Sequence, residues 1–425
     1  MAETDLLIPT TPFHLQILEN CKKYGNAIAL TDTTTGRTLT FTEVLDESLR
    51  IGTTLKRLGI GKGDSILLAL PNCAEYPLIF LGACLNGAIV SGVSPDLTKD
   101  EILQYAVRCK AKLIICDDLA WKRLGDVRQI LVSDVFGPPT VPLHPMSLSE
   151  FVAKTSIGPE DVLLAPFSSG TTDTPKCVHL THDNYNAETA SLKRAVFDSF
   201  GEEKRTTLAL LSFYHGSGFW ALVFCLLEGH HTVIMRQFNL GYMLGYIEKY
   251  KIEIINVVPS IITALARAPP ECELDSVTTV LCGSAPLGKE LCEVFLERFK
   301  SVTSLIQGYG MTEVVILSHT TPVGEKLCEE KLGSCGKLLP GFEAKIVDED
   351  GAIVPTGERG ELLLKGRSVM KGYLGAPSPL DSDGWLRTGD IAYVDVDGYY
   401  YIVDRIKEVF KVPISVNNKQ WILSL

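Results

Sequence analysis

The chain has 425 residues, of which 40 are basic and 51 acidic, and its formal net charge is −11. This length indicates about three folding units, and the 46% share of hydrophobic residues excludes wholesale disorder. An acidic chain without long basic runs is a poor candidate for binding nucleic acid or an anionic membrane, although a local site can still bind a small anion.

The cysteines and the ends of the sequence bear on localisation. The 12 cysteines lie in apolar runs such as LGACLNGAIV and form no CxxC pair, which is typical of reduced, intracellular proteins. The N-terminal MAETDLLIPTTPFH lacks the features of a secretory signal, and the final WILSL is no Ser-Lys-Leu address. The apolar window 208–229 is interrupted by polar residues and predicts a buried helix rather than a membrane span. We expect a cytoplasmic protein.

Short apolar runs alternate with helical patterns through the first three quarters of the chain. Helical spacing is seen at 74–87 and 99–111. Strand-like runs are expected at 64–71, 88–95, 112–118, 231–235, 252–259, 277–283 and 302–310. This alternation predicts mainly parallel sheets covered by helices on both faces.

From about residue 336 the pattern changes. The segments FEAKIVDEDGAIV, GELLLKG and IAYVDVDGYYYIVDR read as strands joined by Asp-Gly and similar turns, which are typical of antiparallel hairpins. The predicted fold class is therefore α/β, with two α/β subdomains and a β-barrel-like antiparallel subdomain at 336–403.

A hydroxyl-rich stretch, PFSSGTTDTPKCVHLTH, spans residues 166–182 and contains Lys176. Ser, Thr and Gly favour turns, so one interpretation is a solvated surface loop. The other is a phosphate-binding loop, in which hydroxyl and backbone N–H groups surround the oxyanions and the lysine neutralises charge. The Walker pattern GxxxxGK[ST] and a GxGxxG loop are both missing, which excludes those two nucleotide-binding motifs.

Two further loops follow predicted strands, LCGSAPLG at 281–288 and QGYGMTE at 307–313. In open α/β sheets, ligands bind outside the carboxyl ends of the strands. Gly283, Gly308 and Gly310 would let the backbone approach such a ligand closely. Either loop alone could be a structural turn.

Together these segments resemble the acyl-adenylate-forming (AMP-binding) superfamily of acyl-CoA synthetases, 4-coumarate–CoA ligases, beetle luciferases and peptide-synthetase adenylation domains. Residues 166–182 resemble its phosphate loop, and LLSFYHGSGF resembles its histidine segment before the acyl pocket. The motifs GSAPL, QGYGMTE, GSCGKLLPG, GELLLKG…KGY, GWLRTGD and DRIKE follow in the family's order. The resemblance covers residues 10–411 and implies ATP-dependent activation of a fatty or aryl acid for ligation to CoA, with Mg²⁺.

The resemblance also implies roles for individual residues. The β- and γ-phosphates of ATP would be held by Ser168, Ser169, Gly170, Thr171, Thr172 and Lys176. The adenine slot and its strand would comprise Gly283, Ser284, Ala285, Gln307, Gly308 and Tyr309, with the Tyr309 ring against the base.

Five more residues are implied. Thr312 would touch the α-phosphate and Glu313 would ligate Mg²⁺, for which a hard oxygen is suitable. Asp390 would accept both ribose hydroxyls, Arg405 would reach the ribose or a phosphate, and His215 would gate the acyl or thiol path. Without the family context, Glu313 would be an exposed carboxylate at a helix start, Asp390 a turn aspartate and His215 a core histidine.

The sequence departs from the family pattern in places. Asp173 and Cys177 replace loop glycines, and an aspartate 4 Å from a phosphate oxygen would cost about 4 kcal/mol at an effective dielectric of 20, unless it points outward. After DRIKEVFK, the tail VPISVNNKQWILSL has no counterpart of the family's late catalytic lysine. We therefore expect an AMP-binding domain at 1–404 and, at 405–425, the truncated start of a C-terminal domain with a divergent tail.

Three functions remain open for this sequence. The first is an acyl-CoA synthetase-like ligase, impaired on its own by the loss of the C-terminal domain. The second is a catalytically weak nucleotide- or acyl-adenylate-binding protein, and the third is a luciferase-like oxygenase. The acyl pocket is expected from 212–219, 307–317 and 338–342.

Overall fold

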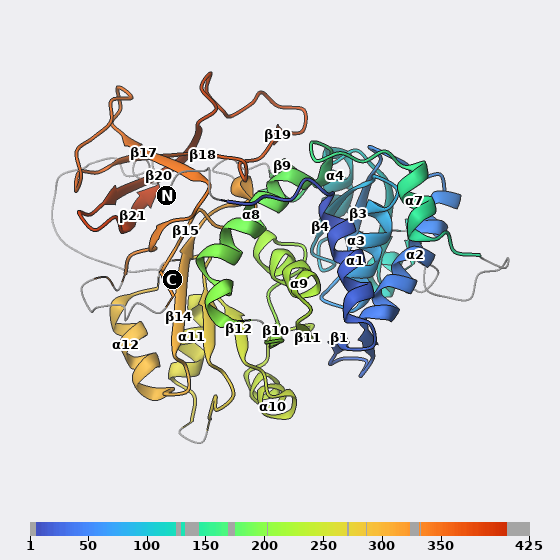
Figure 1. Cartoon of the computed structure of the whole chain (residues 1–425), viewed down its shortest axis with the longest axis horizontal. Coiled ribbons are helices and arrows are strands. Elements are labelled where there is room, and N and C mark those ends of the chain that lie inside the picture. Colours follow the sequence, from blue (N-terminus) through green and yellow to red (C-terminus); the bar gives the residue numbers. More distant parts are fainter. Residues whose placement is uncertain are drawn as a thin grey trace.

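The fold combines three β-sheets with helices packed around them, which confirms the expected α/β class. Figure 1 shows the N-terminal part of the chain, in blue, on one side of the molecule and the late strands, in orange and red, at another edge. The computed structural model describes residues 6–124, 129–131, 144–168, 175–201, 203–269, 272–285, 287–323, 331 and 333–405.

The first sheet has nine strands. In order across the sheet they are β16 (Lys337–Leu338), β15 (His319–Thr320), β14 (Ser304–Tyr309), β13 (Thr279–Cys282), β12 (Ile254–Val257), β10 (Thr206–Ala209), β11 (His231–Ile234), β1 (Ile28–Asp32) and β2 (Thr38–Thr40). The strands from β14 to β1 pair in parallel, whereas β15, β16 and β2 run antiparallel to their neighbours. The loops after β10, β12, β13 and β14 therefore gather at one edge of the sheet.

The second sheet has eight strands and includes the end of the hydroxyl-rich stretch. Its strands are β19 (Gly372–Tyr373), β9 (Lys176–Thr181), β7 (Val162–Leu164), β4 (Ile89–Val93), β3 (Ser65–Ala69), β5 (Ala111–Cys116) and β6 (Gln129–Leu131), with β8 (Phe167–Ser168) beside β9. Strands β6, β5, β3, β4 and β7 pair in parallel, as expected from the alternation with helices.

The third sheet is antiparallel throughout, as predicted for the segment after residue 336. Its order is β17 (Phe342–Val347), β18 (Gly360–Gly366), β20 (Leu386–Val394) and β21 (Tyr400–Arg405). The same segment also supplies β16 to the first sheet and β19 to the second. The antiparallel subdomain is thus paired by strands to both α/β subdomains.

Several of the described helices begin at a side-chain cap. The described helices are α1 (Phe13–Tyr24), α2 (Phe41–Arg57), α3 (Glu75–Cys84), α4 (Lys99–Arg108), α5 (Asp118–Leu124), α7 (Leu148–Lys154), α8 (His182–Ala195), α9 (Gly216–Glu228), α10 (Leu240–Tyr250), α11 (Pro259–Ala266) and α12 (Lys289–Arg298), with the 3₁₀ turns η2 (Phe197–Phe200) and η3 (Thr312–Val314). Helices α2, α4, α7 and α8 each start with a reciprocal capping box, which satisfies two backbone N–H groups.

The apolar window 208–229 forms the end of β10, a short loop and the buried helix α9, as the sequence predicted. Among the described helices, none combines the length and the apolarity that crossing a membrane requires. The cysteines in the described ranges are free thiols, most of them buried.

Buried asparagines join the subdomains near the edge where the loops gather. Asn72, which follows β3, accepts a hydrogen bond from the backbone N–H of Phe213 at 2.8 Å and donates to the carbonyl of Leu211 at 3.0 Å. Asn184 on α8 donates to the carbonyl oxygens of Arg367 and Val369 at 2.6 and 2.9 Å. Since an unpaired buried amide is costly, these contacts fix the loop before His215 and the antiparallel subdomain relative to α8.

A pair of buried histidines makes the stability of the fold depend on pH. The rings of His14 on α1 and His182 on α8 lie 5.1 Å apart, and Nδ1 of His182 accepts the backbone N–H of Phe13 at 3.2 Å. Burial lowers the pKa of His182 to about 4, although Asp161 opposes the shift. Burial and the neighbouring His182 lower the pKa of His14 well below its ordinary value. Both rings are therefore neutral in the folded protein at pH 7.

Replacing His182 tests this linkage. The unfolded chain binds a proton on His182 near pH 6.5 and the folded chain only near pH 4, so the stability present above pH 6.5 is lost as the pH falls toward 4. This loss amounts to roughly 3 kcal/mol of unfolding free energy. We expect urea unfolding of His182→Gln to show a smaller loss between pH 7 and 4.5 than the wild type. His144→Gln, at an exposed position, should keep the wild-type slope. An unchanged slope in His182→Gln would contradict the assignment.

Candidate active site

A cavity of about 930 Å³ opens where the three subdomains meet, at the carboxyl ends of β10, β12, β13 and β14. The structure places many of the residues expected from the sequence on its wall. These are Ser168, Lys176, His215, Gly283, Ser284, Gln307, Gly308, Thr312, Glu313 and Arg405. Ala285, Tyr309 and Asp390 are not among the lining residues. Ser169, Gly170, Thr171 and Thr172 lie outside the described residues, as does Asp173.

The two ends of the hydroxyl-rich loop lie side by side. Ser168 on β8 pairs with Lys176 on β9, and the side chain of Arg108 donates to the carbonyl of Pro175 at 3.2 Å. The Ser168 hydroxyl is buried and has no hydrogen-bond partner within the described ranges. The Cys177 side chain, which replaces a family glycine, is buried with its thiol directed to the carbonyl of Ala165 at 3.8 Å. Lys176, at the start of β9, lines the cavity at this end.

A tight turn between η3 and β15 lines the cavity. Val315 has φ 68° and ψ −63°, and the N–H of Ile316 donates to the carbonyl of Val314 at 2.9 Å, which is the rare γ-turn with positive φ. Such a conformation is strained for a β-branched residue and persists only when its surroundings hold it. A Cβ at Gly310 would lie 1.9 Å from the carbonyl oxygen of Ile316, so glycine is required there.

A buried carboxyl group supports this turn from α8. Glu188 Oε1 accepts the backbone N–H of Leu317 at 3.1 Å. Burial raises the pKa of Glu188 well above its ordinary value, which favours the neutral form of the side chain. A neutral carboxyl group costs less to bury than a carboxylate, and its hydrogen bond helps to hold the turn against the cavity.

Glu313 on η3 carries a carboxylate into the cavity. Its Oε1 accepts a hydrogen bond from the hydroxyl of Tyr373 at 2.8 Å, and its backbone carbonyl accepts the N–H of Met370 at 2.8 Å. The described residues include no cluster of three or more His, Cys, Asp or Glu side chains able to hold a metal ion. Mg²⁺ is commonly bound by one or two carboxylates together with substrate phosphates, so the Glu313 carboxylate suits this ion.

Asp390 and Tyr309 lie behind the cavity wall rather than on it. The Tyr309 hydroxyl donates to Asp390 Oδ2 at 2.6 Å, and Arg405 Nε donates to Oδ1 at 2.8 Å across the β20–β21 pair. Burial and the Asp390 carboxylate raise the pKa of Tyr309 well above its ordinary value. A buried carboxylate is costly without partners, and Asp390 is therefore paired with both Tyr309 and Arg405. The neighbouring Thr388 and Gly389 line the cavity. The ribose and adenine contacts stay predictions.

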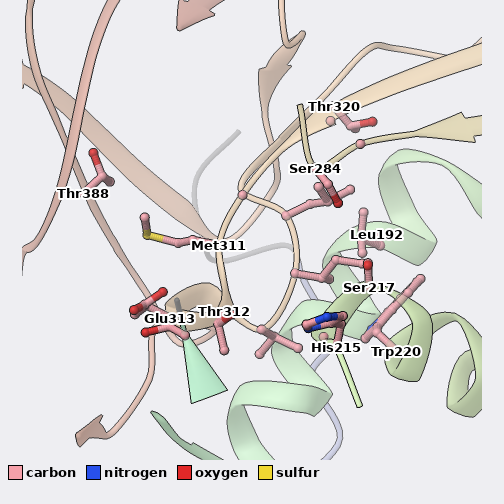
Figure 2. Close-up of a pocket in the computed structure, with 18 of the residues that line it drawn as sticks. Leu192, His215, Ser217, Trp220, Ser284, Met311, Thr312, Glu313, Thr320 and Thr388 are labelled. Atoms are coloured by element: carbon pink, nitrogen blue, oxygen red, sulfur yellow. The ribbon is translucent and has the colours of Figure 1, made fainter. Parts of the chain in front are cut away.

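The opposite side of the cavity is apolar and aromatic. Figure 2 shows Leu192, His215 and Trp220 on one side of the loop that carries Met311, with Glu313 and Thr388 on the other. The Trp220 and Phe224 rings stack at 4.8 Å between centroids. Burial lowers the pKa of His215, so its imidazole is neutral at pH 7. This half of the cavity is suited to an apolar or aryl group.

Sequence reasoning missed several lining residues. Leu192 and Val196 at the end of α8 and Phe197 on η2 line the apolar side, whereas no residue of 338–342 does. The i, i+4 spacing of Leu192 and Val196 on a helix that directly follows the phosphate-loop stretch could have indicated this face. Tyr373 was also missed, because nothing in its local pattern predicts a contact with Glu313.

Comparisons with known proteins agree with this geometry. The profile of the AMP-binding enzyme family matches residues 17–374. The chain is 36% identical over 425 aligned residues to 4-coumarate–CoA ligase 1 of Petroselinum crispum, covering 96% of this chain and 78% of the relative.

Two solved structures have a similar fold. One is o-succinylbenzoate coenzyme A synthetase from Bacillus subtilis in complex with ATP and magnesium ion, with a TM-score of 0.80 and 26% identity over 94% of this chain and 81% of that one. The other is the luciferase-like enzyme from the nonluminescent mealworm Zophobas morio, with a TM-score of 0.82 and 26% identity over 94% and 96% of the two chains.

Replacing Asp390 tests whether it contributes to nucleotide binding. Asp390→Asn keeps the shape of the side chain but removes the charge that strengthens its hydrogen bonds. We expect ATP affinity, measured by calorimetry, to fall by about 1.5–3 kcal/mol, as for hydrogen bonds to a charged group. Asp348→Asn, at an exposed turn of the same subdomain, is the matched control and should bind as the wild type does. Unchanged affinity in Asp390→Asn would remove Asp390 from the nucleotide site.

Proposed function

The chain belongs to the AMP-binding enzyme family, and we propose that it activates a carboxylic acid with ATP as an acyl-adenylate for ligation to CoA. The observation that carries this proposal is the two-sided cavity, with Lys176 and Glu313 at one end and an aromatic wall at the other. A site that joins a nucleotide to an apolar acid needs both halves within one enclosure. The similar structure bound to ATP and magnesium ion supports the choice of co-substrate.

In the proposed reaction, a carboxylate oxygen of the acid attacks the α-phosphorus of ATP and pyrophosphate leaves. Lys176 would neutralise charge on the phosphates, and Thr312 would donate to an α-phosphate oxygen. Mg²⁺, held by Glu313, would offset charge on the phosphate oxygens. Most of the rate in such chemistry comes from positioned charges rather than from covalent catalysis by the protein. His215, neutral at pH 7, lies at the acid side, where it can orient the acyl group or the thiol without adding charge.

The domain assignment is part of the proposal. We propose that residues 1–404 form the AMP-binding domain, because its cavity is lined from all three sheets. Assigning 405–425 to the start of a further domain stays a prediction, since residues 406–425 lie outside the described ones.

Supplying the purified 425-residue chain with ATP, Mg²⁺, CoA and a panel of fatty and aryl acids tests the proposal. Pyrophosphate and thioester are measured separately. We expect acid-dependent pyrophosphate release, which Lys176→Ala lowers by about 10²–10³-fold, the usual cost of losing a preorganised charge contact. Lys154→Ala, at an exposed site on α7, should match the wild type.

Three outcomes separate the alternatives. Pyrophosphate release with little thioester would agree with the expectation that this sequence alone ligates poorly. ATP binding without pyrophosphate release would favour the nucleotide-binding alternative over the enzyme. Light from a luciferin-type acid would favour the oxygenase.

The aromatic wall predicts how acid selectivity can be changed. Trp220→Ala removes an indole that lines the cavity and enlarges its apolar side. A change of one methylene in an apolar pocket alters kcat/KM by about 10–200-fold, so the ratio of long or bulky acids to short ones should rise by at least about 10-fold. Phe238→Ala, at an exposed aromatic residue, is the control for surface effects. An unchanged ratio would show that the acid does not contact Trp220.

A further inference from the structure

Tyr373 reaches the cavity from the antiparallel subdomain. It lies on β19, which pairs antiparallel with β9 so that Tyr373 is opposite Val178. The next residue, Leu374, donates its backbone N–H to the carbonyl of Cys177 at 2.9 Å. Because Lys176 is the first residue of β9, this pairing holds the Tyr373 backbone close to the phosphate-loop lysine.

The Tyr373 side chain contacts both charged groups at the phosphate end of the cavity. Its hydroxyl donates to Glu313 Oε1 at 2.8 Å, and the Lys176 ammonium lies 4.8 Å from the centre of its ring. Burial raises the pKa of Tyr373, so the hydroxyl remains a donor at neutral pH. A cation above a tyrosine ring is attracted only weakly, so an incoming phosphate can take Lys176 from it.

The same segment also holds the backbone of Glu313. Met370 donates its N–H to the Glu313 carbonyl at 2.8 Å, and Lys371 donates to the carbonyl of His179 on β9 at 3.0 Å. Residues 370–374 therefore connect η3, which carries Glu313, to β9, which carries Lys176. A shift of this segment would move both charged groups relative to each other.

On the basis of the proposed function, we propose that Tyr373 is a positioning residue that orients the Glu313 carboxylate toward Mg²⁺ while its ring keeps Lys176 beside the phosphate site. Because Oε1 accepts the hydrogen bond of the tyrosine hydroxyl, the Glu313 carboxylate is held in one orientation. The side chain then loses less conformational freedom when the metal binds. Outer groups that hydrogen-bond a metal ligand typically change metal affinity by about 10–100-fold when they are removed.

Tyr373→Phe tests this role, since it removes the hydroxyl and keeps the ring. The dissociation constant of ATP is measured by calorimetry in EDTA and at a series of Mg²⁺ concentrations, for the wild type and the variant. We expect equal ATP affinity in EDTA and a Mg²⁺ requirement raised by about 10-fold or more in Tyr373→Phe. Tyr400→Phe, a half-buried tyrosine of β21 that does not line the cavity, is the matched control and should retain the wild-type Mg²⁺ dependence.

A double variant separates positioning from general damage. If Tyr373 acts through Glu313, Tyr373→Phe added to Glu313→Gln should weaken Mg²⁺-dependent ATP binding no further than Glu313→Gln alone, because residues in one network are not additive. Additive losses would overturn the proposal, as would a loss of affinity that is the same in EDTA and in Mg²⁺. A wild type that binds no ATP with Mg²⁺ would overturn the proposed function as well. If the wild type binds ATP with Mg²⁺ and Tyr373→Phe shows the same Mg²⁺ dependence, only the role of Tyr373 would be overturned.

Discussion

The attachment of residues 367–374 to α8, β9 and η3 is the constraint on which the site depends. Arg367 forms an ion pair with Asp183 at the start of α8, and the side-chain amide of Asn184 donates to two carbonyl oxygens of this segment. The β19–β9 pairing continues the attachment. The cavity is lined from three sheets, so without this docking the wall that contains Tyr373, Thr388 and Arg405 would be missing.

Buried polar groups set the internal geometry around this junction. Asp390 is 2% exposed and holds Tyr309 and Arg405 together, and the buried Glu188 supports the turn at Val315. Each group would be costly to bury alone, and each forms a hydrogen bond with a residue distant in sequence. These hydrogen bonds therefore favour one arrangement of the subdomains over other arrangements. The strained γ-turn at Val315 shows that such tertiary contacts can outweigh the backbone preference of a single residue.

Charge is distributed to match the proposed chemistry. The chain as a whole is acidic, yet Lys176 and Arg405 line the cavity, as does the carboxylate of Glu313. The acid side is built instead from Leu192, Trp220 and the neutral His215. Separating a charged end from an apolar end lets one enclosure bind a polyanion and an apolar acid, whose reacting carboxylate must lie at the boundary between them.

The sequence by itself determined the fold class and much of the site. Hydrophobic alternation predicted the strands, turn residues predicted the antiparallel subdomain, and strand-end loops predicted that Gly283 and Gly308 lie at a ligand site, because these features depend on neighbouring residues. Thr312 and Glu313, which also line the cavity, were implied by the ordered motifs of the family. Only the tertiary structure decided which side chains meet. Tyr373 forms a hydrogen bond with Glu313, which is 60 positions away in the sequence, and Tyr309 forms one with Asp390, which is 81 positions away. Contacts at such separations depend on how sheets dock and on which buried polar groups need partners, and neither is encoded in a local pattern.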